Sequence, residues 1–125
     1  MKVGMYDKGV CGIEQTFYVG TVDKNTDSST GTELPVKLPA GFRIVGFGID
    51  VKTAFASATL DVTGDQEEPE KYVNAAVLTT AEFVTKDGHY SVVGEKDVAL
   101  TAKLSAAETG DGSADIYVKA VRLEV

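Results

Sequence analysis

The stretch FRIVGFGIDVKTAF, residues 42–55, shows most clearly how this chain folds. From residue 45 to residue 51 every second side chain is apolar, and the positions between hold glycine or a charged residue. Because successive side chains of a strand point to opposite faces, this alternation predicts one long strand with a single buried face. Two glycines on the far face weaken a strand unless another sheet, a bend or another subunit packs closely there. The predicted buried face consists of Val45, Phe47, Ile49, Val51 and Phe55.

Other segments show a similar alternation and extend the prediction to most of the chain. Residues 15–22 are rich in aromatic and β-branched types, and 58–63 and 97–104 alternate cleanly. In the last segment, 113–125, the apolar face changes from Ile116 and Val118 to Val121, which predicts a bulge near Lys119 and Ala120 or burial on both faces. The side chains predicted to point inward in the two clean segments are Ala58, Leu60, Val62, Val98, Leu100, Ala102 and Leu104.

One segment departs from the strand pattern. Residues 70–78, EKYVNAAVL, follow Pro69 and space their apolar side chains in a way that predicts one or two turns of helix. Residues 81–85, AEFVT, again predict a short strand. Six to eight short strands with turn signals about every ten residues indicate an all-β fold, an antiparallel β-sandwich or jelly-roll-like barrel.

The chain divides into three parts along its length. Residues 1–22 are predicted to be an N-terminal arm or a first strand. Residues 23–33, DKNTDSSTGTE, contain no apolar side chain and predict a surface loop or a mobile tether. Residues 34–125 are predicted to form the sandwich body.

Composition narrows the class of partner. The 125 residues carry a formal net charge of -7 and have no clustered lysines or arginines, which argues against nucleic-acid or anionic-membrane binding. No apolar run approaches the roughly 20 residues that span a bilayer, and no secretory signal is recognisable. The single cysteine, Cys11, cannot form an intramolecular disulfide, which fits a protein made in a reducing cytoplasm.

Four groups of residues are candidates for chemical sites. The acidic residues of 61–70 lie around a glycine and a proline, so we interpret them as a solvated loop, with a weak calcium or partner contact and catalysis as alternatives. The DGSAD segment, 111–115, lacks the glycine and glutamate of an EF-hand loop and predicts a turn. His89 has no second histidine to complete a zinc site, and Cys11 has no close basic residue to activate it. We therefore predict no catalytic, cofactor-binding or metal-binding residues. The acidic residues concerned are Asp61, Asp65, Glu67, Glu68 and Glu70.

From Leu34 onward the chain resembles small virion structural proteins of tailed bacteriophages. The segments that carry the resemblance are LPVKLPAGFRIVGFGIDVKTAF, SATLDVTGD, EKYVNAAVL and the terminal DVALTAKLSAAETGDGSADIYVKAVRLEV, in that order. The acidic QEEPE insertion and the RLEV ending depart from the pattern, and residues 1–33 have no counterpart. The resemblance implies a small β-sandwich in the virion, as a capsid decoration or cement protein or a head-fibre protein.

The resemblance also implies partners and a location. The expected partners are the major capsid protein and further copies of the chain itself, on the capsid surface of a virion assembled in a bacterial host. No enzymatic activity, small-molecule substrate, nucleic acid or membrane is expected. The alternatives are a head-fibre, connector or tail component, or a glycan- or receptor-binding sandwich. Partner contacts are expected from the N-terminal part, which could add a strand to the sheet edge of a neighbour, through Tyr6, Val10, Ile13, Phe17 and Tyr18.

Overall fold

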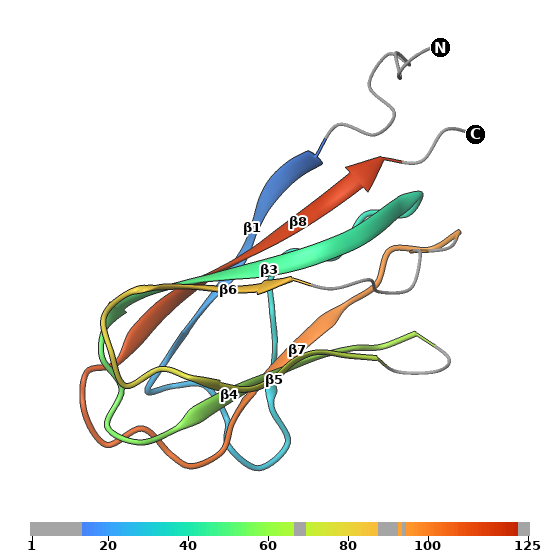
Figure 1. Cartoon of the computed structure of the whole chain (residues 1–125). Helices are drawn as coiled ribbons and strands as arrows, with labels where there is room; N and C mark the ends of the chain where they lie inside the picture. The colour runs from blue at the N-terminus through green and yellow to red at the C-terminus, as the bar shows by residue number, and fades with distance from the viewer. Residues whose placement is uncertain (1–13, 67–69, 88–92, 94, 123–125) are drawn as a thin grey trace.

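The structure, a computed structural model, describes residues 14–66, 70–87, 93 and 95–122. Within these residues the secondary structure is all β (Figure 1). That part of the chain contains no helix long and apolar enough to cross a membrane. The strands are β1 (Glu14–Asp23), β2 (Thr32–Glu33), β3 (Phe42–Thr53), β4 (Thr59–Gly64), β5 (Lys71–Val77), β6 (Phe83–Asp87), β7 (Leu100–Leu104) and β8 (Ser113–Arg122).

The strands form two four-stranded antiparallel sheets that lie one above the other in Figure 1. Sheet A has the order β1-β8-β3-β6, and sheet B has the order β2-β7-β4-β5. The pairs are nested along the chain: β1 pairs with β8, β2 with β7, β3 with β6, and β4 with β5. Eight strands in two sheets with nested pairs make a jelly-roll-like sandwich, so the all-β prediction is confirmed.

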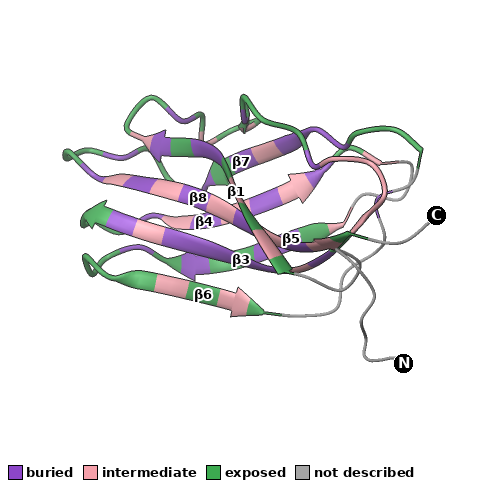
Figure 2. Ribbon diagram, turned by 90° about the horizontal axis from the view of Figure 1, so that it is seen from above, coloured by how far each residue is buried: buried purple, intermediate pink, exposed green. Residues whose placement is uncertain are grey.

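The core lies between the inner faces of the two sheets. Figure 2 shows buried positions alternating with less buried ones along β8, as expected where one face of a sheet is covered, whereas the middle of β3 is buried on both faces from Gly46 to Ile49. The rings of Phe47 in β3 and Tyr72 in β5 lie 5.3 Å apart, centroid to centroid, and thus connect sheet A with sheet B. The inward alternation predicted for 58–63 and 97–104 is confirmed, since Ala58, Leu60, Val62, Val98, Leu100, Ala102 and Leu104 are all buried.

The predicted bulge near Lys119 in the last strand is wrong. In β8 the buried residues Ala114, Ile116, Val118 and Ala120 alternate without interruption. The register shifts occur instead in the neighbouring strands, among them those at Val19 in β1 and at Val45 in β3. Because of the bulge in β3, Ile44 rather than Val45 points into the core. Residues 123–125 lie outside the described residues.

The predicted helix over residues 70–78 is also wrong, because residues 71–77 form strand β5. Leu60 in β4 faces Ala76, and Val62 faces Val73, so two residues of β5 oppose one residue of β4. Ala75 within this bulge has φ of 54°, and its N–H donates a 2.7 Å hydrogen bond to Asp61 Oδ1. The bulge interrupts the period of two, and this interruption produced the apolar spacing that resembled a helix.

The N-terminal segments are part of the sandwich where they are described. Of residues 1–22, for which an arm or a first strand is predicted, the described residues 14–22 belong to β1 and pair with β8, while residues 1–13 lie outside the described residues. The polar segment 23–33 connects sheet A to sheet B, and one of its three threonines, Thr26, is buried. In the same segment, hydrogen bonds from Ser29 and Thr30 lower the pKa of Asp27 to about 2.

Candidate interaction surface

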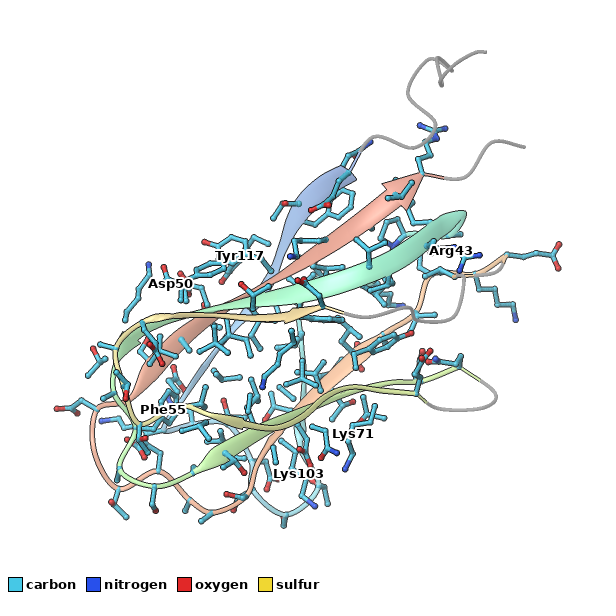
Figure 3. The ribbon with its side chains drawn as sticks, in the orientation of Figure 1. Arg43, Asp50, Phe55, Lys71, Lys103 and Tyr117 are labelled. Atoms are coloured by element: carbon cyan, nitrogen blue, oxygen red, sulfur yellow. The ribbon has the colours of Figure 1, made fainter. Side chains whose placement is uncertain are left out.

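The outer face of sheet A carries aromatic rings from three of its four strands. Tyr18 in β1 lies opposite Tyr117 in β8, with ring centroids 5.7 Å apart in an edge-to-face arrangement. Tyr117 in turn lies opposite Gly48 in β3. Phe83 lies in β6, the neighbour of β3 on the side away from β8; its ring covers the backbone of Gly48, and the residue is 59% exposed. Together these side chains form an aromatic stripe across the sheet, and Figure 3 shows Tyr117 on this outer side.

The two glycines of β3 leave room on this face for side chains of the neighbouring strands. A Cβ added to Gly48 would lie 2.6 Å from Cζ of Phe83, so the phenyl ring rests directly on the glycine backbone. A Cβ added to Gly46 would lie 2.7 Å from Oδ1 of Asp87, whose carboxylate pairs with Lys119 at 2.6 Å. The close packing expected opposite these glycines is therefore supplied by side chains of the same chain.

A chain of hydrogen bonds fixes the polar end of the stripe. Thr21 Oγ1 donates to Asp115 Oδ1 at 2.7 Å, and the second oxygen of Asp115 pairs with Lys52 Nζ at 2.8 Å. Since the one proton of the Thr21 hydroxyl is used in this way, the Tyr18 hydroxyl donates to Thr21 Oγ1 at 2.6 Å. The hydrogen bond from Lys52 lowers the pKa of Asp115, and the same contact raises the pKa of Lys52.

This geometry suits recognition of another macromolecule by fixed side chains. Both members of the Lys52–Asp115 pair remain charged at neutral pH, because each pKa moves away from neutrality. Asp115 accepts from both Lys52 and Thr21, so the pair helps to orient the Thr21 hydroxyl and, through it, the Tyr18 hydroxyl. Rings that are already held in place lose little conformational freedom when a partner binds.

The outer face of sheet B is different in composition. It contains a shallow depression of about 390 Å³ lined by Thr30, Asp61, Thr63, Gly64, Lys71, Thr101 and Lys103. Lys71 approaches Asp61 only to 3.4 Å, and 48% of its side chain is exposed. Figure 3 shows Lys71 and Lys103 on this side of the molecule, away from Tyr117 and Asp50.

The acidic residues considered in the sequence do not converge where they are described. Asp61 supports the β5 bulge, and Asp65 exchanges two hydrogen bonds with Ala99, at 2.9 and 3.0 Å. The backbone oxygen of Glu70 accepts from Gly64 N–H at 3.0 Å, while Glu67 and Glu68 lie outside the described residues. In the described ranges, no group of three histidine, cysteine, aspartate or glutamate side chains could hold a metal ion.

The remaining predicted residues are found in different surroundings. Asp115 of the DGSAD segment lies in β8, while His89 and Cys11 are outside the described residues. Of the predicted partner contacts, Tyr18 is 47% exposed on the outer face of sheet A. Phe17 is partly buried, with its ring 5.5 Å from that of Phe42. Tyr6, Val10 and Ile13 lie outside the described residues.

One buried carboxylate has no counterpart among the residues predicted from the sequence. Glu108 is 8% exposed, and its side chain accepts hydrogen bonds from the N–H groups of Ala56 and Gly112 at 3.1 and 3.0 Å. It thereby joins the β3–β4 and β7–β8 connections, both of which pass from one sheet to the other. A glutamate in the polar segment AAETGDG gives no sign of burial, because such segments are normally solvated.

Comparison with known proteins locates this fold among phage capsid structures. No family model matches the chain, and no curated protein matches it. A chain of the cyanophage Pam1 capsid asymmetric unit matches with a TM-score of 0.65 and 20% identity, over 99% of this chain and 94% of that one. A chain of the acidic stable capsid structure of Helicobacter pylori bacteriophage KHP30 matches with a TM-score of 0.51 and 13% identity, over 90% of this chain and 95% of that one. The protein therefore shares its fold with chains of two phage capsid structures.

Proposed function

We propose that the chain is a structural protein of a tailed-phage virion that binds the major capsid shell as a decoration or cement protein. The observation that carries this proposal is the extent of the match: 99% of this chain aligns with 94% of a chain from the Pam1 capsid asymmetric unit. The two chains thus correspond as whole sandwiches, without a large unmatched domain on either side. The resemblance of residues 34–125 to phage virion proteins supports the same role.

The architecture is physically suited to this role. A cement protein needs a rigid body and an adhesive surface, and nested antiparallel sheets around one core provide the first. In this proposal the aromatic stripe on sheet A is the adhesive surface. In this proposal the protein acts on the outside of the shell, has no enzymatic activity, and is synthesised in the bacterial host.

The residues before β1 have a separate place in the proposal. Residues 1–13 act as an arm that adds to a sheet edge of a neighbour, with Tyr6, Val10 and Ile13 as its apolar contacts. Removal of residues 1–13 takes away the arm, so we expect shell binding to be lost. Because β1 is kept, the circular dichroism spectrum of the body should be retained. Full shell binding by this truncated chain would contradict the role of the arm.

The experiment that tests the function is quantitative mass spectrometry of purified virions, combined with cryo-electron microscopy. Copies in the hundreds on the shell surface are expected, because a decoration protein follows the symmetry of the shell. A dozen or so copies at one vertex would instead indicate a connector or tail component, and absence from virions would overturn the proposal.

A glycan-binding or receptor-binding module is the second candidate, and the exposed rings of Tyr18 and Phe83 favour it over other classes. A glycan array separates the two functions. A reproducible glycan hit without shell binding would support the module and contradict the decoration role.

A further inference from the structure

We infer that the carboxylate of Asp50, together with the aromatic rings beside it, binds an arginine side chain of the partner protein, which in the proposed function is a capsid shell subunit. This inference rests on the proposed function and deepens it, because it names the chemical group that the outer face of sheet A recognises. Asp50 lies on that face, since it alternates in β3 with the buried residues Ile49 and Val51. Figure 3 shows Asp50 and Tyr117 on the same outer side of the sheet.

The negative charge of Asp50 is not neutralised within the described part of the chain. In the register of sheet A, Asp50 lies directly opposite Asp115 of β8, and like charges in such a pair repel each other. Lys52 pairs with Asp115 at 2.8 Å, whereas no ion pair or hydrogen bond joins the Asp50 carboxylate to a described residue. The pKa of Lys52 is raised first by its hydrogen bond with Asp115 and to a lesser extent by Asp50. Two carboxylates thus share one ammonium group, which leaves one negative charge in excess.

The remaining cations of β3 and β8 are paired or distant. Lys119 pairs with Asp87 at 2.6 Å. Arg43 and Arg122 lie at the end of the sheet where β3 begins, roughly 20 Å from Asp50 along a strand that rises about 3.3 Å per residue. Asp50 is therefore available to a cation from outside the chain.

The aromatic rings beside Asp50 favour arginine as that cation. Phe83 of β6 lies directly opposite Asp50, and its ring covers the backbone of Gly48, the preceding residue of β3 on this face. Tyr117 lies opposite the same glycine on the other side. A guanidinium group can form two parallel hydrogen bonds with a carboxylate and can also stack on an aromatic ring, whereas an ammonium group acts as a point charge. One free carboxylate next to exposed rings therefore matches arginine.

A metal ion matches the face less well. Both oxygens of Asp115 already have partners, Thr21 Oγ1 at 2.7 Å and Lys52 Nζ at 2.8 Å. Of the two opposed carboxylates, Asp50 alone could then bind a metal ion, and calcium takes about six to eight oxygen ligands. A basic side chain needs only one carboxylate.

Co-sedimentation with purified capsid shells that lack the protein tests the inference. Asp50→Asn keeps the size of the side chain but removes its charge, so the dissociation constant for shells should rise at least about tenfold. Phe83→Leu keeps an apolar side chain but removes the ring, and it should raise the constant about two- to fivefold. Glu33→Gln is the matched control: Glu33 is exposed on β2 of sheet B, so this variant loses the same charge and should bind as the wild type does. Circular dichroism checks that all variants are folded.

Two results with shells would overturn the inference without touching the decoration role. If Asp50→Asn binds shells as tightly as the wild type, no cation of the shell pairs with Asp50. If Asp50→Asn binds more tightly, the shell presents an acidic or apolar group at this position. In both cases the wild-type protein still binds the shell.

A wild-type protein that does not bind shells would contradict the decoration role, and the arginine site is then tested without shells. N-acetyl-arginine amide and its uncharged counterpart, N-acetyl-citrulline amide, are each titrated into the isotopically labelled protein. The arginine compound should shift the backbone amide NMR signals of residues 48–50 and 115–117 more than the citrulline compound does, and Asp50→Asn should abolish this difference. Equal shifts with the two compounds would overturn the inference.

Discussion

Sheet A and sheet B supply alternating apolar residues to the same core, yet their outer faces are built differently. On sheet A, the Phe83 ring and the Asp87–Lys119 ion pair lie over two glycines of β3, and a second ion pair and two tyrosine rings lie on the same face. On sheet B, threonines and lysines surround a shallow depression, and the only described ion pair there, Lys71–Asp61, is long at 3.4 Å. The difference teaches that the alternating apolar residues determine the core-facing side chains of both sheets but not the side chains on their outer faces. In this chain, the side chains on the outer face of sheet A make the closer contacts.

The strongest test of this comparison sets an inner aromatic against an outer one. Phe47 is fully buried on β3 and packs against Tyr72 of the other sheet, so Phe47→Ala should lower the free energy of unfolding by about 3–5 kcal/mol. Phe83→Ala removes a ring of the same size from the outer face, where it is 59% exposed, and should cost less than about 1 kcal/mol. Urea denaturation of both variants measures the two values. Equal losses would show that the outer stripe belongs to the core in energetic terms.

A smaller effect is expected where the sheets are joined. Glu108→Ala removes the buried acceptor of the Ala56 and Gly112 N–H groups and should destabilise the fold by about 2–3 kcal/mol. Glu82→Ala, at an exposed glutamate, is the control and should change stability by no more than about 0.5 kcal/mol. If thermal unfolding were the same for the two variants, the Glu108 hydrogen bonds would not hold the connections together.

The bulge of sheet B offers a stabilising change. Ala75 has φ of 54°, a conformation that glycine adopts without the strain of a Cβ, so Ala75→Gly should raise stability by about 0.5 kcal/mol. Ala54→Gly makes the same substitution at an exposed alanine without positive φ, and it should lower stability by about 0.4–1 kcal/mol. Opposite signs in chemical denaturation are the expected result. A loss at both positions would mean that Ala75 is not strained.

The same bulge shows what can and cannot be predicted from the sequence. The core-facing residues of β4 and β7 follow from strict alternation, because apolar side chains at every second position are typical of a strand with one buried face. The spacing of the β5 segment predicts a helix, wrongly, because the bulge that creates this spacing depends on Asp61, a residue of another strand. Local spacing contains no information about a partner fourteen residues away.

The outer surface is harder to predict for a related reason. The sequence indicates Tyr18 as a partner contact, but it gives no comparable signal for Phe83 or Lys52. Their positions on one face follow from the pairing of β3 with β6 and β8, which joins residues about 30 to 80 positions apart in the sequence. The buried Glu108 has the same origin, since its donors belong to connections that only the fold brings together.

The smallest predicted effect concerns the ion pairs of the two faces. Asp115→Asn on sheet A should destabilise the protein slightly at neutral pH, whereas Asp61→Asn on sheet B should do so less, because Lys71 is farther from its partner and the new amide oxygen can still accept from the Ala75 N–H. The pKa of Asp115 is below its ordinary value of 3.8, so its contribution is fully present above that pH and is lost as the pH falls through the lowered value. The pKa of Lys52 is raised above 10.5, so the same pair is lost at the alkaline end only as the pH rises through that raised value. Denaturation of wild type and Asp115→Asn from neutral to acid pH should therefore converge at the acid end. A difference between the two proteins that persists in strong acid would show that Asp115 acts through its shape and not through its charge.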